Sequence, residues 1–426
     1  MNEYDSYLIV NLLQKKLNLS LTDDLNLVDI FVLNTCLVRE KASEKVFSQL
    51  GKWKKIKEKK QNIIICVGGC LASFNSKDLL AKAPYIDIIF GPQSLHKLPD
   101  MIKSYLINKT RLINVSFYGK NEKFSYLPDF GIIKDYSSYI TIIEGCNKYC
   151  TYCIVPYSRG YENSRTFADI LSEVYNYTLN NVKEITFLGQ NVNSYIFNDR
   201  NNIIDLPLLL SYVNEIEEIK RIRFLSANPI DFDDKLIFCY SLLSKLSSHI
   251  HLPLQSGSNN ILKLMKRGYT TEFYLSLVNK LRSARTNITF STDIIVGFPG
   301  ETENDFLSTL NLIKKVCFDI SFVYVYSPRP GTVSYNMKDN ICLEEKKNRL
   351  KRVNDLLAIN AKLISKSMVG MIQRILVYKS ISLNSYVGKN DNNRDIVFYS
   401  KISYIGEFIK VKIIDFDKSF LIGALI

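Results

Sequence analysis

The chain has 426 residues, of which 46% are hydrophobic and 23% charged, a composition that is ordinary for a globular protein of two or three domains. No apolar run reaches the roughly 20 residues of a membrane-spanning helix, and the first residues lack a secretion signal. Nine cysteines, partly clustered, do not form a disulfide framework, so we expect a reducing compartment, the cytoplasm. The net charge of +13 favours a nucleic-acid partner, although a Lys-, Asn- and Ile-rich genome would produce the same excess.

Residues 1–115 alternate between helical and strand patterns, which is typical of an α/β domain. A helical stripe of leucines extends from Leu8 to Leu17, and a basic helix is expected over 52–60. Another helix is expected around Leu79 and Leu80. This order predicts a mostly parallel sheet with functional residues at the carboxyl ends of its strands. The predicted buried strands are 29–36, 63–70 and 86–91.

Two of these predicted strands end in a cysteine, Cys36 and Cys70. Because parallel strands end at the same edge of a sheet, both thiols are predicted to lie near one another there. The alternative is a pair of small core residues. Cys66 lies within an apolar run four residues before Cys70, and we expect it to pack inside the sheet.

Residues 116–137 are polar, contain Pro and Gly, and are predicted to be a linker. From 138 to 366 the strand and helix patterns repeat about six times, which predicts a partial (β/α)6 barrel. An amphipathic helix over 344–366 would lead out of this barrel. The predicted barrel strands are 139–145, 184–189, 221–226, 249–254, 288–298 and 321–327.

The first barrel strand leads into a loop with the sequence GCNKYCTYC, in which Cys146, Cys150 and Cys153 are spaced C-x3-C-x2-C. Three thiolates within eight residues can hold one iron–sulfur cube and leave its fourth iron open for a substrate or cofactor. A zinc site is a weaker alternative, because no second C-x2-C or H-x3-H half-site is present. Three unrelated core cysteines are the remaining alternative.

Residues 367–426 contain short alternating strands separated by turn signals, which predict a small β-barrel. The stretch 388–398 resembles a TRAM domain, an RNA-binding module. A purely structural cap is the alternative. The predicted contacts to phosphates and bases are Lys389, Asn392, Asn393, Arg394 and Tyr399.

The cysteine spacing resembles the signature of the radical S-adenosylmethionine (SAM) enzymes. Longer motifs resemble the methylthiotransferases among them, and the MiaB-type tRNA enzymes most closely. The resemblance covers nearly the whole chain. Its motifs are NTCLVREKASEKV at 34–46, IVPYSRGYENSR at 154–165, FLGQNVNSY at 187–195, HLPLQSGSN at 251–259, STDIIVGFPGETE at 291–303 and YSPRPGT at 326–332.

This resemblance implies SAM and two 4Fe–4S clusters as cofactors. The cluster on Cys146, Cys150 and Cys153 would chelate SAM and release a 5′-deoxyadenosyl radical. An auxiliary cluster in the N-terminal domain would hold the sulfur that becomes a methylthio group. The implied substrate is tRNA carrying N6-dimethylallyl-adenosine beside the anticodon, modified at carbon 2, with a reductant such as flavodoxin or ferredoxin. We expect a monomer.

The resemblance also suggests residues that contact SAM. Tyr152 is predicted to stack near the adenine, with a hydrophobic lid as the alternative. Gln190 and Asn191, with Asn193, suit the ribose or amino-acid groups, with turn capping as the alternative. Arg159 and Arg165 are predicted to pair with the SAM carboxylate or an RNA phosphate.

Three other strand-end positions of the predicted barrel carry polar side chains. His251 is expected to be a core or supporting residue, and Asp293 and Glu301 flank the glycine-containing VGFPG segment. Arg329 is predicted to meet a phosphate or to cap the barrel.

One departure from the family concerns the auxiliary cluster, whose ligands here are predicted to be Cys36 and Cys70. The third cysteine usually lies just before the segment that reads MNEYDS in this chain, which begins at Met1. We expect that the natural start lies upstream; a compromised cluster or substitution by Cys66 are alternatives. The alternative functions are methylthiolation of threonylcarbamoyl-adenosine in tRNA or of a ribosomal protein, and a catalytically impaired RNA-binding homologue.

Overall fold

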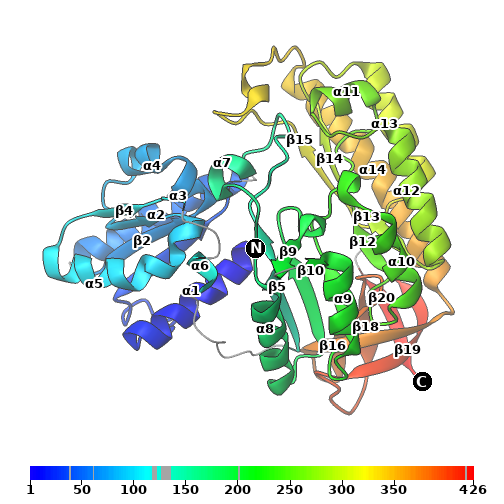
Figure 1. Ribbon diagram of the computed structural model, residues 1–426, viewed down its shortest axis with the longest axis horizontal. Coiled ribbons are helices and arrows are strands. Elements are labelled where there is room, and N and C mark those ends of the chain that lie inside the picture. The colour runs from blue at the N-terminus through cyan, green and yellow to red at the C-terminus, as the bar shows by residue number, and fades with distance from the viewer. Residues whose placement is uncertain (38–39, 61, 118–121, 126–135, 200–201, 418–419) are drawn as a thin grey trace. The chain divides into compact units, whose positions relative to one another are not determined.

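A computed structural model describes residues 1–37, 40–60, 62–117, 122–125, 136–199, 202–417 and 420–426. Contacts between residues divide the chain into two compact units. Figure 1 shows the chain coloured by residue number from the N-terminus to the C-terminus. Unit 1 comprises Met1–Ile132, Ile143–Tyr149 and Cys153–Thr166. Unit 2 comprises Ile133–Ile142, Cys150–Tyr152 and Phe167–Ile426. The expected C-terminal domain therefore belongs to the same unit as the predicted (β/α)6 barrel. Among the described residues no helix is long and apolar enough to cross a bilayer.

Unit 1 is built on a four-stranded parallel sheet with the strand order β1-β2-β3-β4. The three predicted strands are confirmed, and the fourth, β4, is an additional edge strand of three residues. The strands are β1 (Ile30–Thr35), β2 (Ile64–Gly69), β3 (Ile88–Phe90) and β4 (Leu112–Asn114). The helices are α1 (Asn2–Leu17), α2 (Glu40–Lys59), α3 (Cys70–Phe74), α4 (Ser76–Lys82), α5 (Leu98–Asn108), α6 (Glu122–Ser125) and α7 (Val155–Arg159). A short antiparallel pair joins β6 (Ile143–Glu144) to β7 (Asn163–Ser164).

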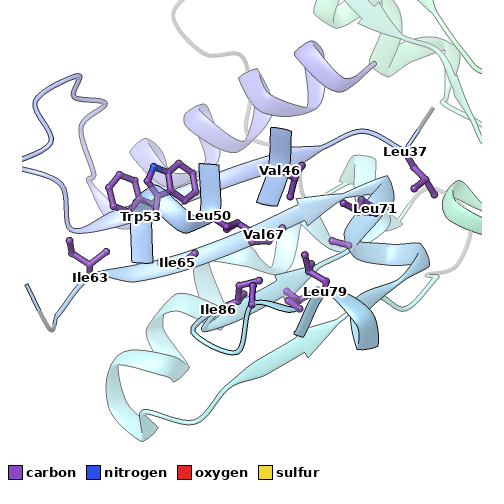
Figure 2. Close-up of a cluster of buried hydrophobic side chains, with 14 of the residues drawn as sticks. Leu37, Val46, Leu50, Trp53, Ile63, Ile65, Val67, Leu71, Leu79 and Ile86 are labelled. Carbon is purple, nitrogen blue, oxygen red and sulfur yellow. The ribbon is translucent and has the colours of Figure 1, made fainter. Parts of the chain in front are cut away.

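Side chains of β2 point alternately to the two faces of the sheet, and one of these faces carries a hydrophobic core of unit 1. Ile65 and Val67 pack with Leu50 and Trp53 of α2 in one buried cluster (Figure 2). Because side chains alternate along a strand, Cys66 points to the opposite face, where it is fully buried. Burial raises the pKa of this thiol far above its ordinary value. The expectation that Cys66 is a core residue is therefore confirmed.

Helix α6 lies inside the stretch 116–137 that the sequence predicts to be a linker. Its Lys123 and Phe124 are buried, so at least this part of the stretch belongs to the core of unit 1 rather than to a solvated connection. Residues 118–121 and 126–135 lie outside the described residues.

Unit 2 contains the partial barrel, whose described strands pair in parallel. Its strands are β5 (Ser137–Thr141), β8 (Glu184–Leu188), β11 (Arg221–Phe224), β12 (His249–His251), β13 (Thr289–Ser291), β14 (Asp293–Val296) and β15 (Phe322–Val325). The predicted strand 288–298 is divided at Thr292, whose hydroxyl accepts from Leu254 N and donates to Leu252 O. A hairpin of β9 (Ile196–Asp199) and β10 (Asn202–Asp205) is added after β8.

Five helices of unit 2 begin at side chains that cap their free N–H groups. Asp205, Asp233, Ser258 and Thr270 each accept from a backbone N–H of the following turn, and Thr302 forms a capping box with Asp305. These caps fix where each strand-to-helix loop ends. The helices are α8 (Phe167–Leu179), α9 (Leu206–Glu215), α10 (Asp234–Leu242), α11 (Asn259–Leu264), α12 (Thr271–Ala284), α13 (Glu303–Val316) and α14 (Leu343–Met368).

After α14 the chain forms a closed five-stranded barrel, as predicted, with the order β16-β17-β18-β20-β19. Alternate residues of its strands, including Ile375, Val377 and Val411, fill the interior. The strands are β16 (Ile372–Ser382), β17 (Ser385–Asn390), β18 (Asp395–Tyr399), β19 (Phe408–Phe416) and β20 (Leu421–Leu425).

The closed barrel is attached to the partial barrel by buried arginines within unit 2. Arg221 bonds to Lys389 O at 2.9 Å and to Asp391 at 2.6 Å, and Arg223 bonds to Asn390 O at 2.6 Å. Glu184 lies at 2.8 Å from Arg221, and the paired arginines help to lower its pKa to about 2 against the effect of burial.

Candidate functional site

The cysteine triplet lies between β6 and α7, and its first cysteine is held by the backbone of unit 1. Gly145 has a φ of +78°, and a Cβ there would lie 2.0 Å from Tyr161 O, so only glycine fits. Cys146 N donates to Gly160 O at 3.2 Å, and Lys148 N lies 3.4 Å from Cys146 Sγ. A backbone N–H directed at the sulfur favours the thiolate, which is the form that binds iron.

The middle cysteine is held by unit 2. Thr151 N donates to Met265 O at 3.1 Å, and Thr151 Oγ1 donates to Leu264 O at 2.9 Å. These bonds fix the chain on both sides of the side chain of Cys150, which is 8% exposed. Cys150 Sγ accepts a hydrogen bond from the guanidinium of Arg267 at 3.3 Å. Nothing in the sequence pattern marks Arg267 as a residue of this site.

The donor set fits an iron–sulfur cube by its chemistry. Cys146, Cys150 and Cys153 are all free thiols, the first two are buried, and each of those two accepts an N–H. Among the described residues, no three His, Cys, Asp or Glu side chains are arranged to hold a single metal ion. Each thiolate of a cube binds a different iron, so its ligands stand further apart than those of one ion. Cys153 is partly exposed.

The structure places the proposed SAM contacts of unit 2 as follows. Tyr152 makes an edge contact with Phe298, with 6.5 Å between ring centroids, in a cluster with Met265. This packing favours the hydrophobic-lid alternative. Asn191 is buried and donates to Asp231 at 2.8 Å, which favours the loop-capping alternative. Gln190 is partly exposed at the end of β8, and its contact with SAM stays a prediction.

Asn193 joins two strand-end loops of the partial barrel. Its side chain donates to Asn228 O at 2.9 Å and accepts from Asn228 N at 2.8 Å. This pairing again corresponds to the loop-capping alternative rather than to a free amide that awaits a ligand.

Arg159, which the sequence analysis assigned to SAM or RNA, lies in a buried group of four charges in unit 1. Its guanidinium lies 2.6 Å from Asp5 and 3.3 Å from Glu144. Lys123 lies 2.6 Å from Glu144 and 3.4 Å from Asp5. Burial would raise the pKa of Asp5, but Arg159 and Lys123 hold it below its ordinary value. Glu144 is two residues before Cys146, so this charge quartet anchors the start of the cysteine loop.

Cys36 and Cys70 follow directly after paired strand residues. Thr35 of β1 is in register with Gly69 of β2, and a Cβ on Gly69 would lie 2.3 Å from Thr35 O. The next residues along both strands are Cys36 and Cys70, and both are partly exposed. Cys70 is also one of the groups that raise the pKa of Arg159. This placement agrees with the predicted pair of ligands, whose role stays a prediction.

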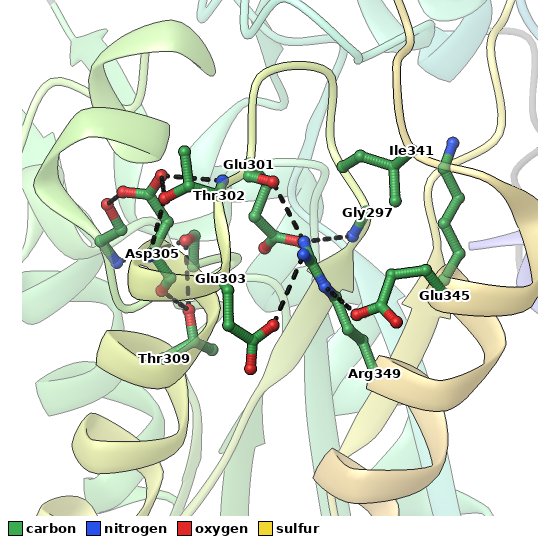
Figure 3. Close-up of polar contacts among 12 residues, drawn as sticks. Gly297, Glu301, Thr302, Glu303, Asp305, Thr309, Ile341, Glu345 and Arg349 are labelled. Atoms are coloured by element: carbon green, nitrogen blue, oxygen red, sulfur yellow. Dashed lines mark hydrogen bonds and ion pairs between the residues drawn. The ribbon is translucent and has the colours of Figure 1, made fainter.

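The VGFPG segment ends in a second buried charge pair. Glu301 accepts from Gly297 N at 2.6 Å and from Arg349 of α14 at 2.8 Å (Figure 3). Burial raises the pKa of Glu301, against the opposing effects of Gly297 and Arg349. The pair locks the loop after β14 onto α14, so Glu301 has a structural role.

His251 lies at the end of β12 with both ring nitrogens engaged. Nδ1 lies 2.9 Å from Ser291 Oγ and Nε2 lies 3.2 Å from Asp293 Oδ2. This is the supporting position that the sequence analysis expected. Arg329 is partly exposed, and Thr332 caps its carbonyl, so its side-chain role stays a prediction.

Two of the predicted RNA contacts are wrong. Arg394 is 2% exposed and forms an ion pair with Asp319, and Asn392 is buried and donates to Ser248 O and Asn287 O, both at 2.8 Å. These side chains attach the closed barrel to the partial barrel and cannot reach RNA. Asn393 and Tyr399 are exposed and Lys389 is partly exposed, so they stay available.

Comparison with known proteins matches two ranges of the chain to family models and the whole chain to curated relatives. Residues 140–313 match the Radical SAM superfamily, and residues 1–91 match Uncharacterized protein family UPF0004. The tRNA-2-methylthio-N(6)-dimethylallyladenosine synthase of Methylobacillus flagellatus is 46% identical over 100% of this chain and 97% of its own length. The chain belongs to this synthase family. The same-named protein of Francisella philomiragia is 45% identical over the same shares.

Membership of this synthase family makes SAM and iron–sulfur clusters the cofactors of the chain. Solved structures agree at the level of the fold. TsrM of Kitasatospora setae, a radical SAM methyltransferase solved with tryptophan and a SAM analog, has a TM-score of 0.57 and 13% identity, over 77% of this chain and 72% of that one. The same protein with cobalamin and a [4Fe–4S] cluster has a TM-score of 0.54 and 14% identity, over 77% and 70%.

Proposed function

We propose that the chain is a radical SAM methylthiotransferase that converts N6-dimethylallyl-adenosine beside the tRNA anticodon to its 2-methylthio derivative. The observation that carries this proposal is the C-x3-C-x2-C loop, two of whose sulfurs accept N–H groups, in a chain 46% identical end to end to a synthase of that name. Cys146, Cys150 and Cys153 hold the SAM-binding cluster, and Cys36 and Cys70 supply two ligands to the auxiliary one.

The reaction needs chemistry that the side chains alone do not supply. The C–H bond at carbon 2 of an adenine has no acidic proton, so a general base cannot open it. His251 already contacts Ser291 and Asp293 with its two nitrogens, which suits a supporting role. The cluster and SAM, when bound, supply a 5′-deoxyadenosyl radical that can take a hydrogen atom from such a bond. The protein's part is to hold the thiolates, orient the adenine and exclude water.

The partner is tRNA, and the closed C-terminal barrel offers a surface for it. Tyr399 is 60% exposed, and Asn393 lies at an exposed turn with a φ of +63°. Lys401, Lys410 and Lys412 are exposed on the same barrel. Exposed aromatic and basic side chains bind single-stranded nucleic acid by stacking and by phosphate contacts. The RNA surface therefore excludes the buried Asn392 and Arg394.

The electron that starts the reaction has to come from outside the chain. A reductant such as flavodoxin or ferredoxin, a monomeric enzyme and a reducing cytoplasmic compartment complete the proposal. Nine free thiols among the described residues suit such a compartment.

Anaerobic reconstitution followed by assay on tRNA tests the proposal. We expect about eight irons per chain if both clusters form, and 2-methylthio-N6-dimethylallyl-adenosine in the digested tRNA. Cys150→Ala should lose about four irons and all product, whereas Cys342→Ala is the matched control, because Cys342 is an exposed cysteine outside both predicted ligand sets. Product on threonylcarbamoyl-adenosine instead would reassign the substrate. RNA binding without SAM cleavage would refute the enzymatic function.

A further inference from the structure

Arg267 is a buried cation next to a predicted cluster ligand. Its side chain is only 9% exposed. Nη1 donates to Cys150 Sγ at 3.3 Å, Nη2 donates to Pro253 O at 3.2 Å, and Nε donates to Tyr269 Oη at 3.1 Å. The guanidinium therefore directs donors at one sulfur, one carbonyl and one hydroxyl.

The backbone around Arg267 fixes the direction of this side chain. Helix α11 ends just before it, and Lys266 and Gly268, on either side of it, have φ values of +55° and +78°. Arg267 N donates to Leu262 O at 3.0 Å. Tyr269 Oη donates to Leu254 O at 2.9 Å and so holds the hydroxyl that accepts from Nε. The guanidinium is thus pre-organised before any cofactor binds.

The partners of Arg267 differ from those of the other buried arginines in unit 2. Arg221 pairs with Glu184, Arg349 with Glu301, and Arg394 with Asp319. Within the described part of the chain, none of the bonds that Arg267 makes is to a carboxylate. A buried cation is stable only when an anion or several hydrogen bonds compensate its lost hydration. Of the two side chains that accept from Arg267, Tyr269 and Cys150, only Cys150 is a predicted cluster ligand, and cysteine binds iron as a thiolate.

We propose that Arg267 is a positioning residue that holds the Cys150 thiolate and raises the reduction potential of the cluster bound there. The inference rests on the proposed function. A cluster gains one negative charge when it accepts an electron, and a cationic donor on a ligand sulfur stabilises that more negative form. The hydrogen bond therefore makes the cluster easier to reduce.

The test compares three variants after anaerobic reconstitution. Arg267→Met removes the donors and the charge, and Arg267→Lys keeps the charge with a different geometry. Arg285→Met is the control, because within the described part of the chain the guanidinium of Arg285 donates to the backbone carbonyls of Tyr240, Leu243 and Leu246 and to no cysteine. Iron content is measured first. An electron paramagnetic resonance titration against potential then follows the signal that changes when SAM is added.

The expected result is a more negative midpoint potential in Arg267→Met, by about 59 mV for each tenfold loss in the one-electron reduction constant. Arg267→Lys should lie between this variant and the wild type, and Arg285→Met should match the wild type. An unchanged midpoint in both Arg267 variants overturns the inference. If Arg267→Met does not fold, Arg267→Lys decides alone. A wild-type protein with no SAM-responsive signal would instead refute the proposed function.

Discussion

The charge quartet of unit 1 gives the sharpest stability prediction. Asp5, Lys123, Glu144 and Arg159 have side chains between 1% and 4% exposed, and their formal charges cancel. Lys123→Met removes one positive charge and leaves a net negative charge in the interior. Because breaking a buried pair by removing one partner costs about 3–5 kcal/mol, we expect unit 1 to lose stability by that amount.

The chain provides a local probe for this experiment. Trp53 is the only tryptophan in the sequence, and it lies in the core of unit 1, stacked on Phe31 with 4.4 Å between ring centroids. Its fluorescence therefore follows unit 1 during urea unfolding. For a urea m-value of about 2 kcal/mol/M, the midpoint should fall by about 2 M in Lys123→Met.

A double variant and a control make the result specific. Lys123→Met with Glu144→Gln removes one charge of each sign and leaves Asp5 paired with Arg159, so at least half of the lost stability should return. Lys59→Met alters an exposed residue of α2 and should leave the midpoint unchanged. The reasoning would be refuted by a fall of less than about 0.5 M in the urea midpoint of Lys123→Met, or by a double variant that unfolds at a lower urea concentration than Lys123→Met alone.

Three further predictions concern other sites. The pKa of Glu184 in the folded protein is about 2, against an ordinary value of 4.5, so its contribution to stability is complete above pH 4.5 and is lost as the pH falls toward 2. The difference in stability between the wild type and Glu184→Gln should therefore shrink over that range. Urea unfolding followed by far-ultraviolet circular dichroism measures this difference. Arg394→Met leaves Asp319 buried and unpaired, and should detach the closed barrel, which limited proteolysis would detect as faster cleavage within 369–395; an unchanged cleavage rate counts against this role. Gly145→Ala should clash with Tyr161 O and reduce the iron bound on reconstitution, whereas Gly51→Ala, at a position with open space, should not.

The sequence predicts the elements of this fold where the pattern is local and long. The strands around Ile65 and Ile185 are buried apolar runs, and both were predicted within about two residues of their ends. The edge strand β4 has only three residues and is partly exposed, so it carries too weak a pattern to be recognised. Short elements of this kind depend on the sheet that they join.

The cysteine triplet was predictable because its spacing is local, but its supporting groups were not. Arg267 lies 117 residues from Cys150, and Asp5 lies 154 residues from Arg159. Contacts over such separations depend on the packing of the whole unit. In sequence, Arg267 appears as one more basic residue after a helix, which gives no signal of burial.

The errors in the C-terminal barrel have the same physical origin. A turn with Asn392 and Arg394 has the composition of an exposed, basic loop. These two side chains are buried because the turn packs on the partial barrel, where Asn392 donates to Ser248 O and Arg394 pairs with Asp319. The composition of the turn therefore suggested contacts to RNA, whereas both side chains bond to the protein itself.

Isotope transfer tests the central claim most directly. tRNA that carries N6-dimethylallyl-adenosine with deuterium at carbon 2 is incubated with the reconstituted, reduced protein and SAM, and the 5′-deoxyadenosine is analysed by mass spectrometry. We expect deuterium in 5′-deoxyadenosine together with methylthiolated product from the wild type, and neither of them from Cys150→Ala. Methylthiolated product whose formation leaves 5′-deoxyadenosine free of deuterium would contradict radical attack at that carbon.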